Sequence, residues 1–161
     1  MAKTVDAGDR APNFSLTDQA GQTVRLKDFK GTPVVLYFYP KDDTPGCTKE
    51  ACNFRDAETA IKRTGAVVLG VSMDAAASHQ KFIAKYKLPF SLLCDEEAKV
   101  SKAFGVYKLK SMYGRTYWGI ERSTFVIDGS GVIKAAFRKV KVDGHAGEVL
   151  AALKALKPDG Q

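Results

Sequence analysis

Two continuous apolar runs, separated by a long helix-forming segment, constrain the fold of this chain most strongly. The runs cover residues 33–39 (PVVLYFY) and 66–72 (AVVLGVS), and both are rich in β-branched and aromatic side chains. Such runs suit strands that are buried on both faces of a parallel sheet. The segment between them, 45–63, predicts a helix that ends near Gly65. A strand, a crossover helix and a second strand are therefore expected at the centre of the molecule.

The remaining segments extend this central unit in both directions. Residues 14–17 and 23–26 alternate on either side of a turn at 18–21, which predicts an N-terminal β-hairpin. Further strands are expected over 90–93, 117–120, 123–127 and 132–137, and further helices over 75–86, 96–104 and 144–156. This order predicts one α/β domain over residues 1–161, a thioredoxin-like sandwich whose central mixed sheet is flanked by helices.

Charge and hydropathy narrow the classes of function. The net charge is +7, but lysines and arginines are mixed with acids along the chain, and the densest basic cluster, at 138–141, is short. A solvated surface therefore explains the charge better than nucleic-acid binding does. No apolar run is long enough to span a membrane, and the polar N-terminal segment does not resemble a secretory signal. The expected location is the cytoplasm.

The chain has three cysteines, Cys47, Cys52 and Cys94. An odd count without an export signal argues against a framework of structural disulfides, which leaves catalysis, metal binding or inert buried thiols. Cys94 closes the apolar run FSLLC, so we expect a buried structural thiol there, with a second resolving thiol as the alternative. His79 and His145 have no ligand-type spacing, which favours surface or capping roles over a metal site.

The position of Cys47 at the start of a helix is the most informative local feature. Thr44 precedes Pro45, and proline is favoured at the first helical position. Thr44 is therefore the expected N-cap and Cys47 the third helical residue, with the threonine hydroxyl bonded to the amide of Cys47. Free N–H groups and the positive end of the helix dipole favour an anion there. The sequence thus predicts a reactive thiolate at Cys47.

Cys52 lies five residues after Cys47 on the same predicted helix. In a wound helix the two Cα atoms would be about 8.6 Å apart. A disulfide needs a separation of about 4.4–6.8 Å. If the two thiols are redox partners, the first turns of the helix must therefore unwind in each cycle.

The sequence around Cys47 resembles a known family. Residues 40–47 (PKDDTPGC) match the peroxiredoxin pattern of proline, three residues, threonine, two residues and cysteine. The longer stretch FYPKDDTPGCTKEAC resembles the bacterioferritin-comigratory, or PrxQ, branch of that family. The likeness begins at GDRAPNF (8–14), continues through GIERSTFVID (119–128) and reaches the closing helix.

The resemblance implies a role for each of five residues. Cys47 is similar to the peroxidatic cysteine, and Cys52 to the resolving cysteine that closes an intramolecular disulfide. Thr44 resembles the threonine that binds the sulfur and the peroxide, and Pro40 the proline that shields the site. Arg122 resembles the active-site arginine, although its position before an alternating segment would by itself indicate a surface salt bridge.

The resemblance also implies the reaction. Hydrogen peroxide and organic hydroperoxides are the expected substrates, thioredoxin or a related dithiol protein is the expected reductant, and antioxidant defence is the expected process. Neither a metal nor an organic cofactor is expected, and neither is a nucleic-acid or membrane partner.

Two other classes of function stay open from the sequence alone. One is a thiol–disulfide oxidoreductase, although four residues rather than two separate the cysteines. The other is a non-enzymatic module that binds metal or nucleic acid. We expect a monomer because no exposed apolar stripe stands out. Tyr113, Tyr117 and Trp118 are expected either to form an apolar collar around the pocket or to pack in the core.

Overall fold

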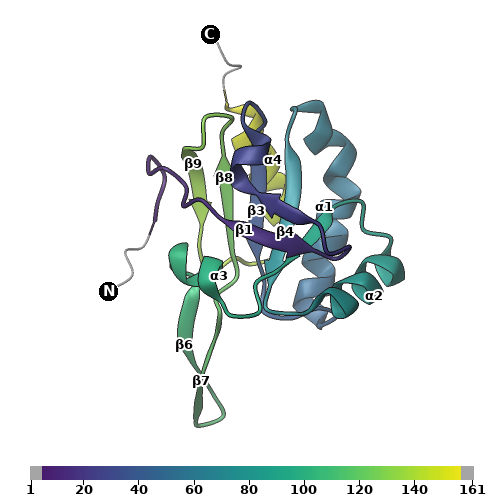
Figure 1. Cartoon of the computed structure of the whole chain (residues 1–161), viewed down its shortest axis with the longest axis vertical. Helices are drawn as coiled ribbons and strands as arrows, with labels where there is room; N and C mark the ends of the chain where they lie inside the picture. The colour runs from purple at the N-terminus through teal and green to yellow at the C-terminus, as the bar shows by residue number, and fades with distance from the viewer. Residues whose placement is uncertain (1–4, 157–161) are drawn as a thin grey trace.

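A seven-stranded mixed sheet forms the centre of the molecule in the computed structural model, which describes residues 5–156 (Figure 1). Its strand order is β2-β1-β5-β4-β3-β8-β9. The strands are β1 (Ser15–Asp18), β2 (Thr23–Arg25), β3 (Val34–Phe38), β4 (Val67–Ser72), β5 (Ser91–Cys94), β8 (Ser123–Ile127) and β9 (Ile133–Phe137). The β3, β4 and β5 strands are parallel, whereas the pairs β3–β8, β8–β9, β1–β5 and β1–β2 are antiparallel. The predicted mixed sheet and N-terminal hairpin are therefore confirmed.

The helices follow the predicted order. They are α1 (Pro45–Arg63), α2 (Ala76–Tyr86), α3 (Lys99–Ala103) and α4 (His145–Lys154), and a 3₁₀ turn, η1 (Leu26–Phe29), leads into β3. The α1 helix has the predicted bounds, and Gly65 follows its C-cap with a φ of +90°, a conformation that glycine adopts without strain. Within the described residues, no helix has the length and apolarity needed to cross a membrane.

The α3 helix is shorter than predicted. The sequence predicts a helix over 96–104, but regular turns begin only at Lys99. The carboxylate of Asp95 accepts hydrogen bonds from the amides of Val100 (3.2 Å) and Ser101 (2.7 Å). Because Asp95 binds the first free amides across a turn in which Ala98 has a φ of +58°, residues 96–98 are excluded from the helix.

The side chains of β3 and of Tyr39, the residue after it, alternate between two apolar clusters, one on each face of the sheet. Val35, Tyr37 and Tyr39 belong to the cluster that α1, α2 and α4 cover. Val34, Leu36 and Phe38 belong to the cluster that the N-terminal segment and α3 cover. All of these β3 side chains are buried, which explains why the strand reads as a continuous apolar run.

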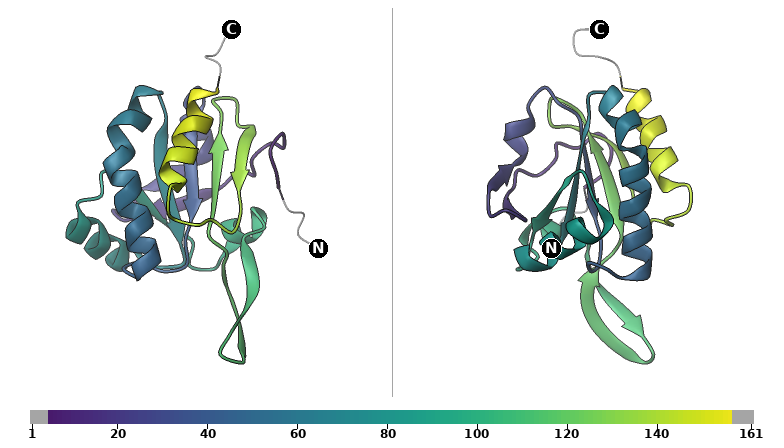
Figure 2. Two further views of the ribbon diagram at one scale, coloured as in Figure 1. Left: turned by 180° about the vertical axis from the view of Figure 1, so that it is seen from behind. Right: turned by 90° about the vertical axis from the view of Figure 1, so that its right-hand side faces the viewer.

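A second, two-stranded sheet extends beyond the body of the molecule (Figures 1 and 2). It is the hairpin of β6 (Tyr107–Met112) and β7 (Arg115–Ile120), which turns at Tyr113 and Gly114, both with positive φ. The sequence predicted a strand over 117–120 but none over 107–112. For the three aromatic residues, the alternative of core packing is wrong, because Tyr113, Tyr117 and Trp118 are exposed on this hairpin. The alternative of a collar around the pocket stays a prediction.

Candidate active site

The first turn of α1 presents Cys47, as the sequence predicts. The loop after β3 ends at Thr44, which occupies the N-cap with extended backbone angles, and Pro45 takes the first helical position. Cys47 is thus the third helical residue. The N–H groups of this first turn have no acceptor within the helix, so they point toward the space in front of the turn. The start of α1 therefore provides donors for a developing anion.

Thr44 does not form the cap hydrogen bond that the sequence predicts. Its side chain makes no bond to the helix amides, and its hydroxyl instead donates to the carbonyl oxygen of Lys41 at 2.9 Å. The carbonyl of Lys41 competes successfully because the loop folds back on itself within three residues. The hydroxyl oxygen of Thr44 keeps its lone pairs, and the amide of Cys47 is not occupied by this side chain.

Arg122 reaches Cys47 because β8 pairs with β3. Phe38, at the end of β3, lies opposite Ser123 at the start of β8. This register brings the residue before Ser123 beside the start of α1. The Nη2 atom of Arg122 donates to the Sγ atom of Cys47 at 3.3 Å. The predicted cation thus meets the predicted nucleophile, although they are 75 residues apart in the chain.

Gly46 leaves the room that this contact needs. A Cβ atom at this position would lie 3.1 Å from the Nη2 atom of Arg122. That distance is tighter than an ordinary van der Waals contact, so a larger residue would push the guanidinium away from the sulfur.

Glu50 is a site residue that the sequence reasoning missed. Its Oε1 atom accepts a hydrogen bond from the Nη1 atom of Arg122 at 2.7 Å, and the side chain is buried. Burial raises the pKa of Glu50 to about 7, against the opposing effect of the Arg122 charge. The spacing could have revealed it, because residues i and i+3 share a helix face and Glu50 is three residues after Cys47.

The sulfur of Cys47 is enclosed but has a cationic partner. Its residue is only 2% exposed and belongs to the cluster beneath α1. The guanidinium of Arg122 lies at the sulfur, and the free amides of the first turn point toward the same space. The thiol of Cys47, the guanidinium of Arg122 and the carboxyl group of Glu50 therefore form a connected row.

Cys52 and Cys94 occupy different settings. Both are free thiols, as is Cys47. Cys52 lies within the continuous α1 helix and is half-buried. Cys94 is buried at the end of β5, where its Sγ atom lies 3.9 Å from the carbonyl oxygen of Asp18, and burial raises the pKa of its thiol. The expected burial of Cys94 is confirmed. A raised thiol pKa beside a carbonyl oxygen does not favour the reactive thiolate.

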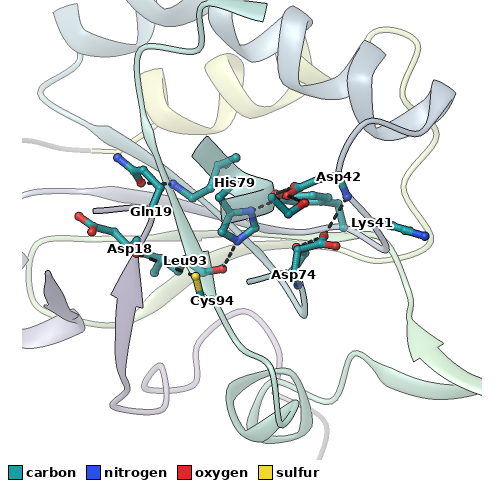
Figure 3. Close-up of polar contacts among 12 residues, drawn as sticks. Asp18, Gln19, Lys41, Asp42, Asp74, His79, Leu93 and Cys94 are labelled. Carbon is teal, nitrogen blue, oxygen red and sulfur yellow. Dashed lines mark hydrogen bonds and ion pairs between the residues drawn. The ribbon is translucent and has the colours of Figure 1, made fainter. Parts of the chain in front are cut away.

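The loop that precedes Cys47 is fastened from behind by a buried polar network (Figure 3). The carboxylate of Asp42 accepts hydrogen bonds from the hydroxyls of Tyr39 (2.6 Å) and Ser78 (2.8 Å), and it lies 2.7 Å from the Nδ1 atom of His79. The amide of Asp42 donates to the carboxylate of Asp74 at 2.9 Å. These bonds attach the loop to α2 and to the segment after β4.

His79 is the buried centre of this network, so the expected surface or capping role is wrong for it. Its Nε2 atom lies 2.9 Å from the carbonyl oxygen of Leu93, and its Nδ1 atom faces the carboxylate of Asp42. Both ring nitrogens face acceptors, so these contacts favour a ring that carries both protons. Burial lowers the pKa of His79, but the hydrogen bond and charge of Asp42 outweigh that effect and raise it.

Asp42, Asp74 and His79 are close enough to one another to hold a cation. Their facing atoms are already engaged, however, with Tyr39, Ser72, Ser78 and the carbonyl of Leu93. These contacts account for the polar atoms without a metal.

His145 is likewise buried rather than exposed. It is the first residue of α4, and its Nε2 atom lies 2.7 Å from the hydroxyl of Thr124 on β8. Burial lowers the pKa of His145. Pro40, by contrast, is exposed, two residues after the end of β3, and its shielding role stays a prediction.

Comparisons with known proteins agree with this geometry. Residues 7–136 match the AhpC/TSA family. The chain is 51% identical over 151 residues to peroxiredoxin Bcp of Bacillus subtilis, covering 94% of this chain and 96% of that one. It is 50% identical over 153 residues to the chloroplastic peroxiredoxin Q of Oryza sativa subsp. japonica, covering 94% and 68%. The solved structure of Xanthomonas campestris peroxiredoxin Q superposes with a TM-score of 0.86 at 43% identity, covering 96% and 97%.

Proposed function

This chain belongs to the AhpC/TSA family and resembles its peroxiredoxin Bcp and Q members, and from that premise we propose how its residues carry out the reaction. The chain is a thiol peroxidase. We assign Cys47 as the peroxidatic cysteine. The observation that carries this assignment is the hydrogen bond from the Nη2 atom of Arg122 to the Sγ atom of Cys47, at 3.3 Å.

In the first step the thiolate of Cys47 attacks the terminal oxygen of a hydroperoxide. An S–O bond forms, the O–O bond breaks, and the departing oxygen takes a proton to leave as water or an alcohol. The sulfur is oxidised to a sulfenic acid by two electrons. Negative charge develops on the departing oxygen, where Arg122, the first amides of α1 and the hydroxyl of Thr44 provide donors. Pro40 limits access of water to the same space.

In the second step Cys52 resolves the sulfenic acid. Its sulfur attacks the sulfur of Cys47, an S–S bond forms, and the hydroxyl group leaves as water after taking the thiol proton. Both cysteines lie in the continuous α1 helix, so this step requires the start of α1 to unwind.

A dithiol protein completes the cycle. Thioredoxin or a related protein gives two electrons and two protons to the disulfide, and its own thiols become a disulfide. Hydrogen peroxide and organic hydroperoxides are the proposed substrates. We further propose that the chain acts as a monomer and in the cytoplasm, where dithiol pools are kept reduced.

The test is mass spectrometry of the peroxide-treated protein, combined with three single variants. Cys47→Ser is expected to abolish peroxide consumption. Cys52→Ser is expected to stop at a sulfenic acid on Cys47. Cys94→Ser is the matched control, because a buried thiol outside the site should not change the rate. Wild-type turnover by Cys47→Ser would contradict the assignment, and so would a disulfide that includes Cys94.

A further inference from the structure

The β6–β7 hairpin exposes large apolar side chains outside the body of the protein. Leu109 is 58% exposed, Met112 55%, Trp118 59% and Tyr113 97%. A two-stranded hairpin is only marginally stable alone, and exposed apolar groups on a projecting element indicate contact with a partner. Figures 1 and 2 show the hairpin extending past the end of the sheet at which α1 begins.

The strand register sorts the hairpin side chains onto two faces. Lys108 lies opposite Gly119, Lys110 opposite Tyr117 and Met112 opposite Arg115. Because opposed residues share a face and neighbours alternate, the side chains of one face are Lys108, Lys110, Met112, Arg115 and Tyr117. We call this set the basic face. Residues 107–120 contain three cations and no acidic residue.

The basic face continues into the active site. The β7 strand ends at Ile120, two residues before Arg122. Burial lowers the pKa of Lys110, and the charge of Arg122 lowers it further, whereas the charges of Glu121 and Cys47 act in the opposite direction. Lys110 therefore senses the charges of both active-site groups. A protein seated on the basic face would meet the disulfide that Cys47 and Cys52 form.

We propose that the basic face is the docking surface for the protein dithiol that reduces this disulfide, and that the docked surface of that protein is acidic and partly apolar. The proposal rests on the proposed function. A hydroperoxide is too small to use a surface of this size, whereas a protein that donates two electrons and two protons must bring its thiols to the sulfurs. The basic face includes Tyr117, Met112 and Arg115, and Tyr, Met and Arg are side chains that protein interfaces favour.

A second copy of the same chain fits this surface poorly. The chain carries a net charge of +7, and two basic faces would bring six cations together. Like charges at an interface oppose association, whereas an acidic partner would be steered toward the face.

The experiment uses a double charge reversal, Lys108→Glu with Arg115→Glu, in the full chain. Turnover of hydrogen peroxide is measured with an acidic thioredoxin and, separately, with dithiothreitol. We expect kcat/KM for thioredoxin to fall by roughly tenfold or more, with turnover on dithiothreitol unchanged. The wild-type kcat/KM for thioredoxin should fall with added salt, and this salt dependence should be weaker in the variant.

Two further variants make the comparison specific. Lys27→Glu with Lys30→Glu makes the same change of charge before β3 begins, at the end of the sheet opposite to Cys47. This control variant should leave turnover unchanged with thioredoxin and with dithiothreitol. Lys108→Gln with Arg115→Gln removes the charges without adding acids and should give an intermediate loss with thioredoxin alone.

Several outcomes would overturn the proposal. One is that the hairpin and control variants lower kcat/KM for thioredoxin by the same factor. Another is that the hairpin variant loses as much turnover with dithiothreitol as with thioredoxin. Binding of a labelled oligonucleotide that depends on the hairpin, with unchanged kcat/KM for thioredoxin, would assign the face to nucleic acid instead. If the wild type fails to turn over peroxide even with dithiothreitol, the proposed function fails, and that result is distinct from all the others.

Discussion

Arg122 links the sulfur of Cys47 to the buried carboxyl group of Glu50. Under the proposed function, removal of Arg122 should affect only the half-reaction with peroxide. Arg122→Met deletes the donor 3.3 Å from Cys47 while keeping an apolar stem in place. We expect the rate constant for the reaction with peroxide to fall by about 10²–10³, because the departing oxygen loses a preorganised donor. Reduction of the disulfide by thioredoxin should be nearly unchanged, since that step develops no charge on a departing peroxide oxygen.

Stopped-flow measurements of each half-reaction check this prediction. Arg122→Lys is the matched control, which keeps the charge but cannot bond to Cys47 and Glu50 together, and it should recover only part of the rate. Equal losses in both half-reactions would show that Arg122 has a structural role.

Glu50 predicts a pH dependence of stability. Its pKa is about 7 in the folded protein, raised by burial from an ordinary value of 4.5. A raised pKa stabilises the fold fully below the ordinary value, and this contribution is lost as pH rises through the folded value. Relative to Glu50→Gln, the wild type should therefore lose up to about 3 kcal/mol of unfolding free energy between pH 4.5 and pH 8.

Urea unfolding of both proteins across this pH range measures the difference. The matched control is Glu96→Gln, at an exposed glutamate, which should follow the wild type at every pH. A constant difference between the wild type and Glu50→Gln across the range would mean that Glu50 titrates normally.

These residues also show which features of the site can be predicted from the sequence. The position of Cys47 could be predicted because Pro45 and Thr44 define a helix start locally. Arg122 could be assigned only through the family resemblance, because its contact depends on the register of β8 against β3. The bond from Thr44 to Lys41 and the burial of Glu50 depend on how the loop and the helix pack, which local patterns do not describe.

At the scale of elements, the start of α1 and the loop before it should behave differently during the cycle. The α1 helix must unwind for Cys52 to reach Cys47. The loop is held by Asp42, whose carboxylate and amide are bonded to α2 and to Asp74. These bonds do not involve α1, so the loop should stay fixed while the helix opens.

Hydrogen exchange can resolve this contrast. After oxidation by one equivalent of peroxide, we expect the amides of residues 48–53 to exchange at least tenfold faster, because they lose their helical acceptors. The amide of Asp42 should keep its protection. In Cys52→Ser, which cannot form the disulfide, peroxide should leave α1 protected. Faster exchange at Asp42 that equals the change in α1 would show that the loop opens together with the helix.

The two β-hairpins show which strands can be predicted from the sequence and which cannot. The pair β1–β2 could be predicted because apolar and polar residues alternate across a turn. The β6 strand was missed because both of its faces are largely solvated, so no alternation separates a buried side from an exposed one. A strand whose apolar groups face outward resembles a loop in the sequence.

At the scale of the whole molecule, β3 joins the two apolar clusters, and this supports our proposal of a single domain. Its alternating side chains enter the cluster beneath α1, α2 and α4 and the cluster beneath the N-terminal segment and α3. If one cluster loses its packing, β3 is no longer held in position, and the other cluster then loses its packing as well. The two clusters should therefore unfold together.

Calorimetry of two variants under reducing conditions tests this coupling. Val35→Ala makes a cavity in one cluster and Leu36→Ala in the other, and both side chains are fully buried. Each is expected to cost about 1–5 kcal/mol and to lower one shared Tm by about 2–4 °C for each kcal/mol. The calorimetric and van't Hoff enthalpies should stay equal in all three proteins, because destabilising either cluster shifts the same transition. The contrary outcome is that Val35→Ala splits the transition, so that one part keeps the wild-type Tm. That result would contradict the prediction, because it would show that the two clusters unfold as separate units and that β3 does not couple them.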